Sequence, residues 1–356
     1  MRTFVKRAAA MLLTASAVLC LASCREKAEK EPPSDTALPT VCENVPENEN
    51  KAEAERTETL LITTTVFSNG VNYDDGVELI VYECDTQTLE LTPVFRRKIY
   101  SVYPANTVDF SSGKFYFADA DEKRLYDNMF CFDMKTGEVN KLTDGKFAFD
   151  DFLMVDGVLY ANAAREYCNA VQPARFDTED NSFTYRNPDD DDTMHVSFSY
   201  DRYEDAFLIT TCSLAERSTH RVAAETHITP KTVSWLSKDF KTVTPIFFTE
   251  DFEINTTRRL DEKRILMTTE PYMTAKRTMK LLDIETKEVT DVNIPGLLQE
   301  YMFYPLEDGN TVFLIGQNTV PSWQFYRYKM DSGELTHIEF PETPAQIVDL
   351  QLTSRS

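Results

Sequence analysis

The segment Met129-Phe-Cys-Phe-Asp-Met-Lys-Thr-Gly-Glu-Val-Asn-Lys-Leu142 has the pattern of an apolar strand, a polar turn and a second strand. Asp, Thr and Gly suit such a turn, because short polar side chains cap it and Gly tolerates a positive φ. The same pattern recurs in three further segments and, more loosely, in two others: Leu79–Val94, Lys280–Val292, Phe325–Ile338, Arg175–Phe183 and Trp235–Val243. Six copies of one supersecondary unit predict a repeat architecture.

The copies are almost evenly spaced. Their aligned positions, separated by 48, 44, 60, 46 and 46 residues, are Asp85, Asp133, Asp177, Ser237, Asp283 and Lys329. An interval near 46 residues with four short strands per unit is typical of β-propeller blades. A further pair of alternating strands precedes the hairpins, as at Thr107–Ala118, Phe152–Tyr160 and Tyr304–Phe313. We therefore predict an all-β domain over residues 59–356, a six-bladed β-propeller of four-stranded antiparallel blades.

The two ends of this domain support the same fold. The first blade begins at Thr59–Val66, and no candidate inner strand precedes it. Near the other end, Pro344–Leu350 mirrors Pro104–Phe110, which we expect to be an inner strand. The C-terminal strand is therefore predicted to close the first blade and to remove the open edge of the ring. An eight-stranded barrel or a sandwich would explain neither the interval nor the matching ends.

One blade resembles a known family. The segment Asp133–Gly145, with Phe110–Lys114 ahead of it, resembles the repeat of TolB-type six-bladed propellers. The other blades keep the pattern loosely and mostly lack the Pro-Asp that precedes the hairpin Gly in that family. Its members include periplasmic scaffolds and the non-catalytic halves of peptidases. The resemblance implies the fold and a binding role, and it selects no ligand.

The N-terminus has the parts of an export signal. Arg2, Lys6 and Arg7 precede an uncharged run, Ala8–Ser23, which is shorter than the roughly 20 residues that span a bilayer. The next residue, Cys24, ends the motif Leu-Ala-Ser-Cys, which resembles the lipobox of bacterial lipoproteins. That resemblance implies a signal peptide over residues 1–23, a diacylglyceryl group on Cys24 and an extracytoplasmic, membrane-anchored protein. A cysteine inside an ordinary cleaved signal is the alternative.

Residues 24–58 are predicted to form a disordered tether. Prolines lie among many Glu, Lys and Asn residues there, and few large apolar side chains are present to offset the entropy of ordering. The formal net charge of the chain is −22. Such a charge argues against nucleic acid as a partner and against a second, electrostatic attachment to anionic lipid. We expect a monomer.

The sequence offers little sign of chemistry. It has no Gly-x-Ser-x-Gly nucleophile motif, and its four histidines form no zinc-binding pair. The acidic run Asp189–Asp192 lacks the alternating ligands of a calcium loop, so we interpret it as a solvated loop. We therefore predict no catalytic residue, no metal and no cofactor. Five scattered cysteines are interpreted as buried thiols, with one or two disulfides left open: Cys42, Cys84, Cys131, Cys168 and Cys212.

One face of the ring is the candidate for binding. In propellers, the loops between the second and third strands of each blade share a rim with the connections between blades. The longest such loop here is Ser213–Pro230. In an acidic chain, the basic side chains of this rim suggest a site for an anionic ligand, with ordinary loop charges as the alternative: Arg217, His220, Arg221, His227, Lys123, Arg124, Arg165, Lys276 and Arg277. Trp235 and Trp323 are candidates to stack on sugars or to fill the core.

These observations favour a non-catalytic binding or scaffold module for an envelope protein or for an anionic or glycan polymer. The alternative is a propeller enzyme, a hydrolase or lyase of glycans or cell wall, with carboxylates and His220 or His227 converging near the axis.

Overall fold

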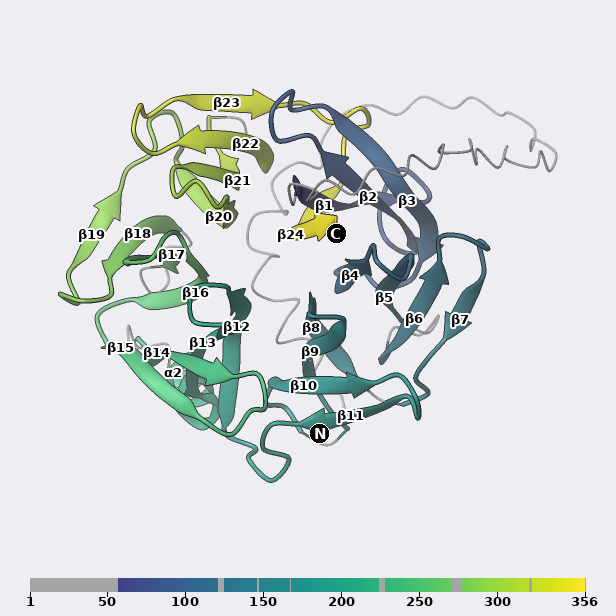
Figure 1. Ribbon diagram of the computed structural model, residues 1–356, viewed down its shortest axis with the longest axis horizontal. Coiled ribbons are helices and arrows are strands. Elements are labelled where there is room, and N and C mark those ends of the chain that lie inside the picture. Colours follow the sequence, from purple (N-terminus) through teal and green to yellow (C-terminus); the bar gives the residue numbers. More distant parts are fainter. Residues whose placement is uncertain are drawn as a thin grey trace, which may run out of the picture. The chain divides into compact units, whose positions relative to one another are not determined.

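The computed structural model describes residues 57–120, 125–145, 147–166, 168–223, 228–270, 277–319 and 322–355. These residues form six antiparallel sheets of four strands each, arranged as blades around a central axis (Figure 1). The predicted fold class is therefore confirmed. The predicted signal peptide, Cys24 and the tether through residue 56 lie outside the described residues, so their assignment stays a prediction.

Each blade runs from an inner strand at the axis to an outer strand at the rim (Figure 1). The inner strands are β24 (Gln346–Arg355), β4 (Asn106–Asp109), β8 (Ala148–Val155), β12 (Thr193–Asp201), β16 (Glu253–Arg259) and β20 (Gln299–Pro305). The second strands are β1 (Thr57–Phe67), β5 (Lys114–Ala120), β9 (Val158–Ala164), β13 (Ala206–Ser213), β17 (Arg264–Glu270) and β21 (Thr311–Gln317). In this order the strands belong to blades 1 to 6.

The remaining strands lie farther from the axis. The third strands are β2 (Val77–Cys84), β6 (Asp127–Asp133), β10 (Gln172–Asp177), β14 (Lys231–Ser237), β18 (Thr278–Asp283) and β22 (Gln324–Lys329). The outer strands are β3 (Leu91–Ile99), β7 (Val139–Lys141), β11 (Ser182–Tyr185), β15 (Val243–Thr249), β19 (Val289–Val292) and β23 (Leu335–Ile338). We call the end with the connections between blades and between second and third strands the loop face. The opposite end is the turn face.

The hairpins that revealed the repeat are built by side-chain capping. The Oδ1 atom of Asp133 accepts the backbone N–H groups of Lys135 and Thr136 at 2.8 and 3.0 Å. Asp85 and Asp283 do the same for the residues two and three positions on. An Asp at this position therefore fixes the turn between the third and outer strands.

The apolar core is divided among the interfaces of the ring. In the part of the chain that the structure describes, six clusters of buried side chains each combine residues from two neighbouring blades. The cluster that joins blades 1 and 6 contains Leu60 and Ile62 together with Phe313 and Phe325, all fully buried. Because each fully buried side chain of this size contributes about 1.5–3 kcal/mol, the blades stabilise one another rather than themselves.

The ring is closed by the predicted strand. β24 pairs antiparallel with β1, from Thr57 opposite Arg355 to Thr65 opposite Gln346. Leu350 of this strand is fully buried and belongs to the cluster between blades 1 and 6. Blade 1 therefore joins two segments from opposite ends of the domain, as the mirrored sequences suggested.

Five of the six inner strands contain a β-bulge at the same place. In each, one residue has no partner in the second strand: Val348, Asp150, Val196, Asn255 and Tyr301 in blades 1, 3, 4, 5 and 6. A bulge breaks the alternation of side chains and redirects those that follow it. The bulges therefore decide which side chains of the inner strands face the axis.

The loop expected over Ser213–Pro230 contains a helix, α2 (Leu214–Ala223). Its first turn is capped from a distance, because Asp192 accepts the N–H of Ala215 at 2.7 Å, while Ser213 accepts that of Glu216 at 3.1 Å. Asp190 accepts the N–H groups of Asp192 and Thr193. The acidic run is thus a structured turn and helix cap rather than only a solvated loop.

Candidate functional site

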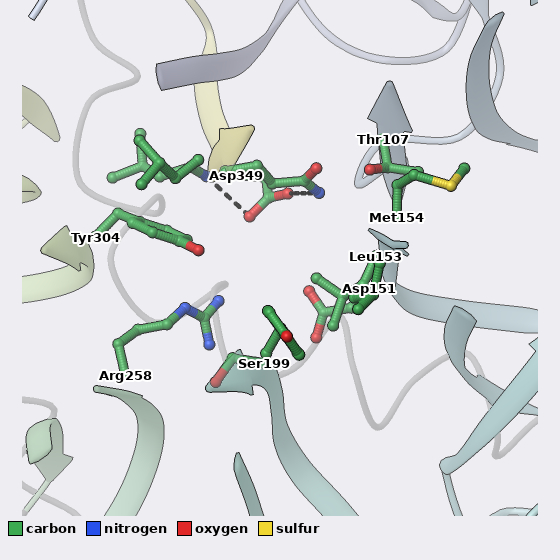
Figure 2. A pocket seen from close by; sticks show the side chains of 13 residues that line it. Thr107, Asp151, Leu153, Met154, Ser199, Arg258, Tyr304 and Asp349 are labelled. Carbon is green, nitrogen blue, oxygen red and sulfur yellow. Dashed lines mark hydrogen bonds between the residues drawn. The ribbon is translucent and has the colours of Figure 1, made fainter. Parts of the chain in front are cut away.

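A small cavity lies on the axis of the ring, with a volume of about 80 Å³ (Figure 2). Every inner strand contributes at least one residue to its wall, and one residue of each forms a layer with intervals of about 46 residues apart from one longer interval: Thr107, Leu153, Ser199, Arg258, Tyr304 and Gln351. In the five bulged strands this residue lies three positions after the bulged one. Arg258 and Tyr304 are next to last in their strands. The cavity therefore occupies the half of the channel nearest the turn face.

Two carboxylates border the cavity on the side of this layer that is nearer the loop face. Asp151 and Asp349 each follow the bulge directly, in blades 3 and 1, and both point toward the common space (Figure 2). Asp349 is held in place, because its two oxygens accept the backbone N–H of Leu350 at 2.8 Å and the side-chain amide of Gln351 at 2.7 Å. Within the described residues, Asp151 has no hydrogen-bond partner and no ion pair.

Arg258 brings a positive charge into the same cavity. Its side chain is 8% exposed, and its guanidinium lies over the ring of Tyr304 at 5.6 Å from the centroid. One Nη atom donates to the carbonyl oxygen of Thr257 at 3.1 Å, whereas Nε has no partner among the described residues. No described carboxylate lies within ion-pairing distance of it. Figure 2 shows the guanidinium directed at the space that Asp151 also faces.

The surroundings favour a shared proton on the two carboxylates. The pKa of Asp151 is raised to about 7, mainly by burial and also by the nearby Asp349, while Arg258 opposes the shift. Burial also raises the pKa of Asp349, against the influence of Arg258 and the Gln351 amide. With one proton between these carboxylates, their remaining charge balances that of Arg258 near neutral pH.

Asp150, the bulged residue beside Asp151, has a different position. Its side chain is exposed to solvent, yet it is surrounded by the inner strands, and this crowding raises its pKa to about 6. Arg217 of α2 lowers the pKa of Asp150, and Asp127 raises it. Asp150 does not line the axial cavity. Of these two adjacent aspartates, only Asp151 therefore lines the axial cavity.

A second feature lies on the loop face. Tyr73 and Tyr103 are 50% and 42% exposed, and they come from the β1–β2 loop and the connection from β3 to β4. Burial raises the pKa of Tyr103, which the neighbouring Tyr301 and Tyr73 also raise. The rings of Tyr301 and Trp323 lie 5.3 Å apart. These four aromatic residues from blades 1 and 6 and from the connection to blade 2 are called the tyrosine patch.

Three of the basic rim residues have side chains that the structure describes, and each of them contacts a different group: Arg165, Arg217 and Arg277. Arg165 pairs with Asp191 at 3.6 Å, and Arg277 pairs with Glu270 at 3.3 Å. The Arg277 guanidinium also lies over the Tyr301 ring at 4.4 Å, next to the tyrosine patch. Arg217 donates to the sulfur of Met194. His220 and Arg221 are on α2, but their side chains are outside the described atoms, as are Lys123, Arg124, His227 and Lys276 altogether.

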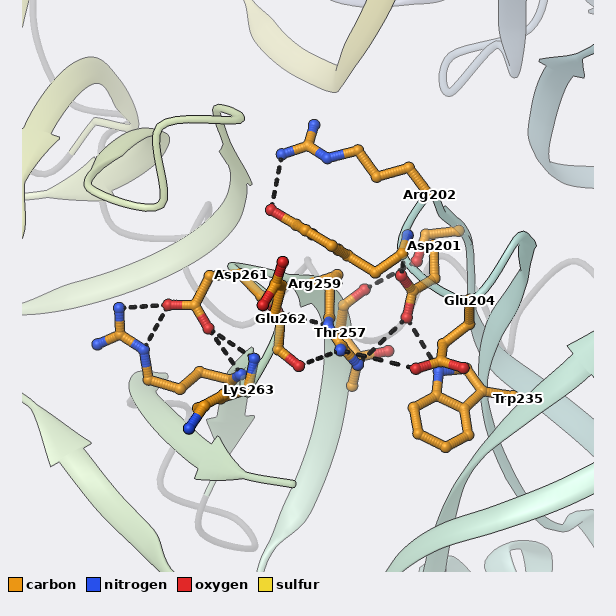
Figure 3. A network of polar contacts seen from close by, with 12 residues as sticks. Asp201, Arg202, Glu204, Trp235, Thr257, Arg259, Asp261, Glu262 and Lys263 are labelled. Atoms are coloured by element: carbon orange, nitrogen blue, oxygen red, sulfur yellow. Dashed lines mark hydrogen bonds and ion pairs between the residues drawn. The ribbon is translucent and has the colours of Figure 1, made fainter. Parts of the chain in front are cut away.

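A third polar cluster lies near the turn face and is structural (Figure 3). Asp201, which is fully buried, accepts the Trp235 indole N–H at 2.9 Å and the Tyr203 backbone N–H at 3.0 Å. Its carboxylate lies 3.4 Å from the guanidinium of Arg259, which also donates to the carbonyl of Asp261. This network joins blades 4 and 5. Its carboxylate is fully occupied, so it offers no free group to a ligand.

His195 is likewise structural. Arg186 approaches its Nε2 at 3.0 Å, and its Nδ1 lies 3.2 Å from the carbonyl oxygen of Val171. The pKa of His195 is lowered to about 3, mainly by burial and also by Arg186. The ring is therefore neutral, with Nδ1–H donating to Val171. It fastens blade 4 to blade 3.

Other site classes find little support in the described ranges. They contain no group of three potential metal ligands and no helix long and apolar enough to span a bilayer. Cys84, Cys131, Cys168 and Cys212 are buried and free, and Cys42 lies outside the described residues. Sequence reasoning did not find Asp151, Arg258 and Asp349. The repeat interval applied to the inner strands could have found the layer that contains Arg258.

Comparisons with known proteins identify the fold. No family model matches the chain, and no curated protein is similar in sequence. TolB from Acinetobacter baumannii has a similar structure, with a TM-score of 0.53 and 13% identity over 82% of this chain and 66% of that one. A putative TolB from Agrobacterium tumefaciens gives 0.51 and 9% over 80% and 90%. Hydrazine synthase of Kuenenia stuttgartiensis gives 0.58 and 10% over 85% and 47%.

The chain thus spans slightly less than two thirds of the Acinetobacter TolB and about half of the hydrazine synthase chain. At these identities the likeness shows a TolB-like propeller fold alone.

Proposed function

We propose that this protein is a non-catalytic binding module, exported and anchored to the membrane through a diacylglyceryl group on Cys24, that holds a glycan chain on its loop face. The observation that carries the ligand class is the tyrosine patch. Sugars bind well to such surfaces, because their C–H faces stack on aromatic rings while their hydroxyl groups bond to phenol and amide groups. Tyr103 already receives a hydrogen bond from the Gln346 amide at 3.2 Å.

The charges on the loop face favour a neutral glycan over an anionic polymer. Arg165 and Arg277 are each paired with a carboxylate, and Arg96 is paired with both Glu78 and Glu342. A strongly anionic chain would have to displace these acids in a molecule of formal charge −22. A glycan with uncharged faces avoids that cost.

The test is a titration of the full chain in detergent with tetrameric N-acetylglucosamine, with maltotetraose as the second probe. Trp323 reports binding by its fluorescence, because it is in the patch. Tyr73→Ala and Tyr103→Ala should each weaken binding by about 2- to 10-fold, the contribution of one stacked ring. Phe248→Ala is the matched control, since Phe248 is 58% exposed but lies on the outer strand β15.

Equal binding by all three variants, or no binding of either oligosaccharide, would refute the glycan proposal. An envelope protein on the same face would then be the alternative to examine.

A second candidate function rests on the carboxylates of the axis. Asp151 and Asp349 have raised pKa values, which suits one of them to donate a proton while the other stays ionised. This pair favours a glycan or cell-wall hydrolase. Release of reducing ends from purified wall glycan by the full chain, and its loss in Asp151→Asn, would establish that function. Lack of turnover in the unmodified chain would exclude it.

A further inference from the structure

The axial cavity holds charges of both signs that do not pair with each other. The Arg258 side chain is more than nine-tenths buried, its Nε has no partner among the described residues, and it points into the cavity (Figure 2). Asp151 faces the same space and has no hydrogen bond within the described chain. A buried charge without a partner is costly, and such groups are typical of sites completed by a ligand.

The rest of the wall keeps these charges apart. Tyr304 packs against the guanidinium of Arg258, and Gln351 holds Asp349 through its amide. That amide also donates to the carbonyl oxygen of Phe152 at 3.2 Å, which ties blade 1 to the strand that carries Asp151. The Asp151 carboxylate and the Arg258 guanidinium are therefore held by different blades of the ring.

We propose that the axial cavity binds a small zwitterion, such as the α-ammonium and carboxylate end of an amino acid, between Asp151 and Arg258. The carboxylate of the ligand accepts hydrogen bonds from the Arg258 guanidinium. Its ammonium group donates to Asp151, with Asp349 as the second acceptor. Both unpaired charges are then satisfied by one molecule.

Size and charge balance both favour this ligand class. A cavity of about 80 Å³ holds the equivalent of two or three water molecules at about 30 Å³ each, so it admits only a very small molecule or the end of a larger one. An isolated anion would satisfy Arg258 but crowd the two carboxylates. An isolated ammonium ion would leave Arg258 without a partner. A zwitterion fits because its two charges match those of the wall.

This inference is independent of the glycan proposal, because it concerns another face and other residues. The experiment is a calorimetric titration of the full chain in detergent with glycine and with alanine. Methylammonium and acetate, which each carry one half of the zwitterion, are the comparison probes. We expect glycine to bind at least about 10-fold more tightly than either half, since each loses one charge-assisted contact.

Asp151→Asn should weaken glycine binding at least about 10-fold. Asp150→Asn is the matched control, because the neighbouring carboxylate does not line the cavity; it should bind glycine within about 3-fold of the unmodified chain. Arg258→Gln should also lose binding. A thermal melt of each variant separates loss of the site from loss of the fold, and Asp151→Asn should melt no lower than the unmodified chain.

Four results would overturn the proposal. Equal binding of acetate and glycine would make this an anion site, and equal binding of methylammonium would make it a cation site. Absence of glycine and alanine binding at about 10 mM would mean that water alone fills the cavity, and undiminished binding by Asp151→Asn would mean that glycine binds elsewhere on the chain. Tyr103→Ala should leave glycine binding unchanged, so failure here is distinct from failure of the glycan proposal.

Discussion

Replacing Asp201 by Ala tests the network that joins blades 4 and 5. Asp201 is fully buried and accepts hydrogen bonds from Trp235 and from the backbone of Tyr203. Among the described residues, Asp201 forms an ion pair with Arg259, whose side chain is 5% exposed and whose guanidinium also lies 3.9 Å from the Glu204 carboxylate. Alanine would leave buried Arg259 with only the more distant and partly exposed Glu204 among the described carboxylates, and it would leave two N–H donors without an acceptor.

The expected loss follows from these contacts. Removing one member of a buried ion pair lowers the free energy of unfolding by about 3–5 kcal/mol, because the remaining charge stays desolvated. Trp235→Phe removes a single hydrogen bond to a charged acceptor and should cost only about 1.5–3 kcal/mol. Adding Arg259→Met to Asp201→Ala should recover part of the loss, since the unpaired cation is gone.

The assay is urea denaturation followed by far-ultraviolet circular dichroism, with Asp144→Ala as the control. Asp144 has a side chain that is 92% exposed and pairs with Lys141 on the surface, so its loss should cost far less than the loss of a buried partner. If Asp201→Ala lowers the free energy of unfolding no more than Asp144→Ala does, the network contributes nothing to joining the blades and the reasoning is wrong.

Three further predictions follow from the axis, the closing strand and the anchor. The pKa of Asp151 is raised from 3.8 to about 7 in the folded chain, and that of Asp349 is also raised. The folded chain therefore binds more protons than the unfolded chain between about pH 4 and 7. The free energy of unfolding is highest at low pH in respect of these two groups, and it falls as the pH rises through this window. Asp151→Asn should therefore gain about 2.5 kcal/mol relative to the unmodified chain between pH 5 and 7.5, measured by urea denaturation, and a constant difference would contradict the shift. Deleting residues 344–356 removes β24 and its buried Leu350, so the chain should aggregate and lose its cooperative melt; an unchanged melt would contradict closure by this strand. Cys24→Ala should release the chain from carbonate-washed membranes or leave it unprocessed, and normal retention would argue against the lipid anchor.

The sequence predicts the blades because their signals are local. Asp85, Asp133 and Asp283 cap hairpins that close within a few residues, so the turn chemistry is visible in a short window. The closing strand was also found, although its register was not. Asp109 lies at the last position of β4 and bonds to Ser111, whereas Asp349, which looks equivalent in sequence, follows a bulge in the middle of β24.

The axial cavity was not predicted, because no local sequence pattern reports it. Asp151 and Asp349 meet only because the ring brings blades 1 and 3 around a common axis, and no local pattern reports that distance. The bulges add a second difficulty, since the extra residue Asp150 shifts the alternation and makes it impossible to tell from spacing which aspartate faces inward. The sequence analysis did not predict the helix α2, although one of its two caps, Ser213, lies within the segment and the other, Asp192, lies outside it.

The pairing of β1 with β24 also decides when the ring can close during synthesis. Among the described strands, β1 is the first to leave the ribosome or the translocation pore and β24 is the last. Until then the edge of β1 carries unpaired backbone groups beside Leu60 and Ile62, which are fully buried once the ring has closed. Contacts between such distant segments form slowly, and an open strand edge is prone to aggregate meanwhile. We therefore expect the yield of folded protein in the cell to depend on how well that edge is shielded before the ring closes, as well as on the stability of the closed ring.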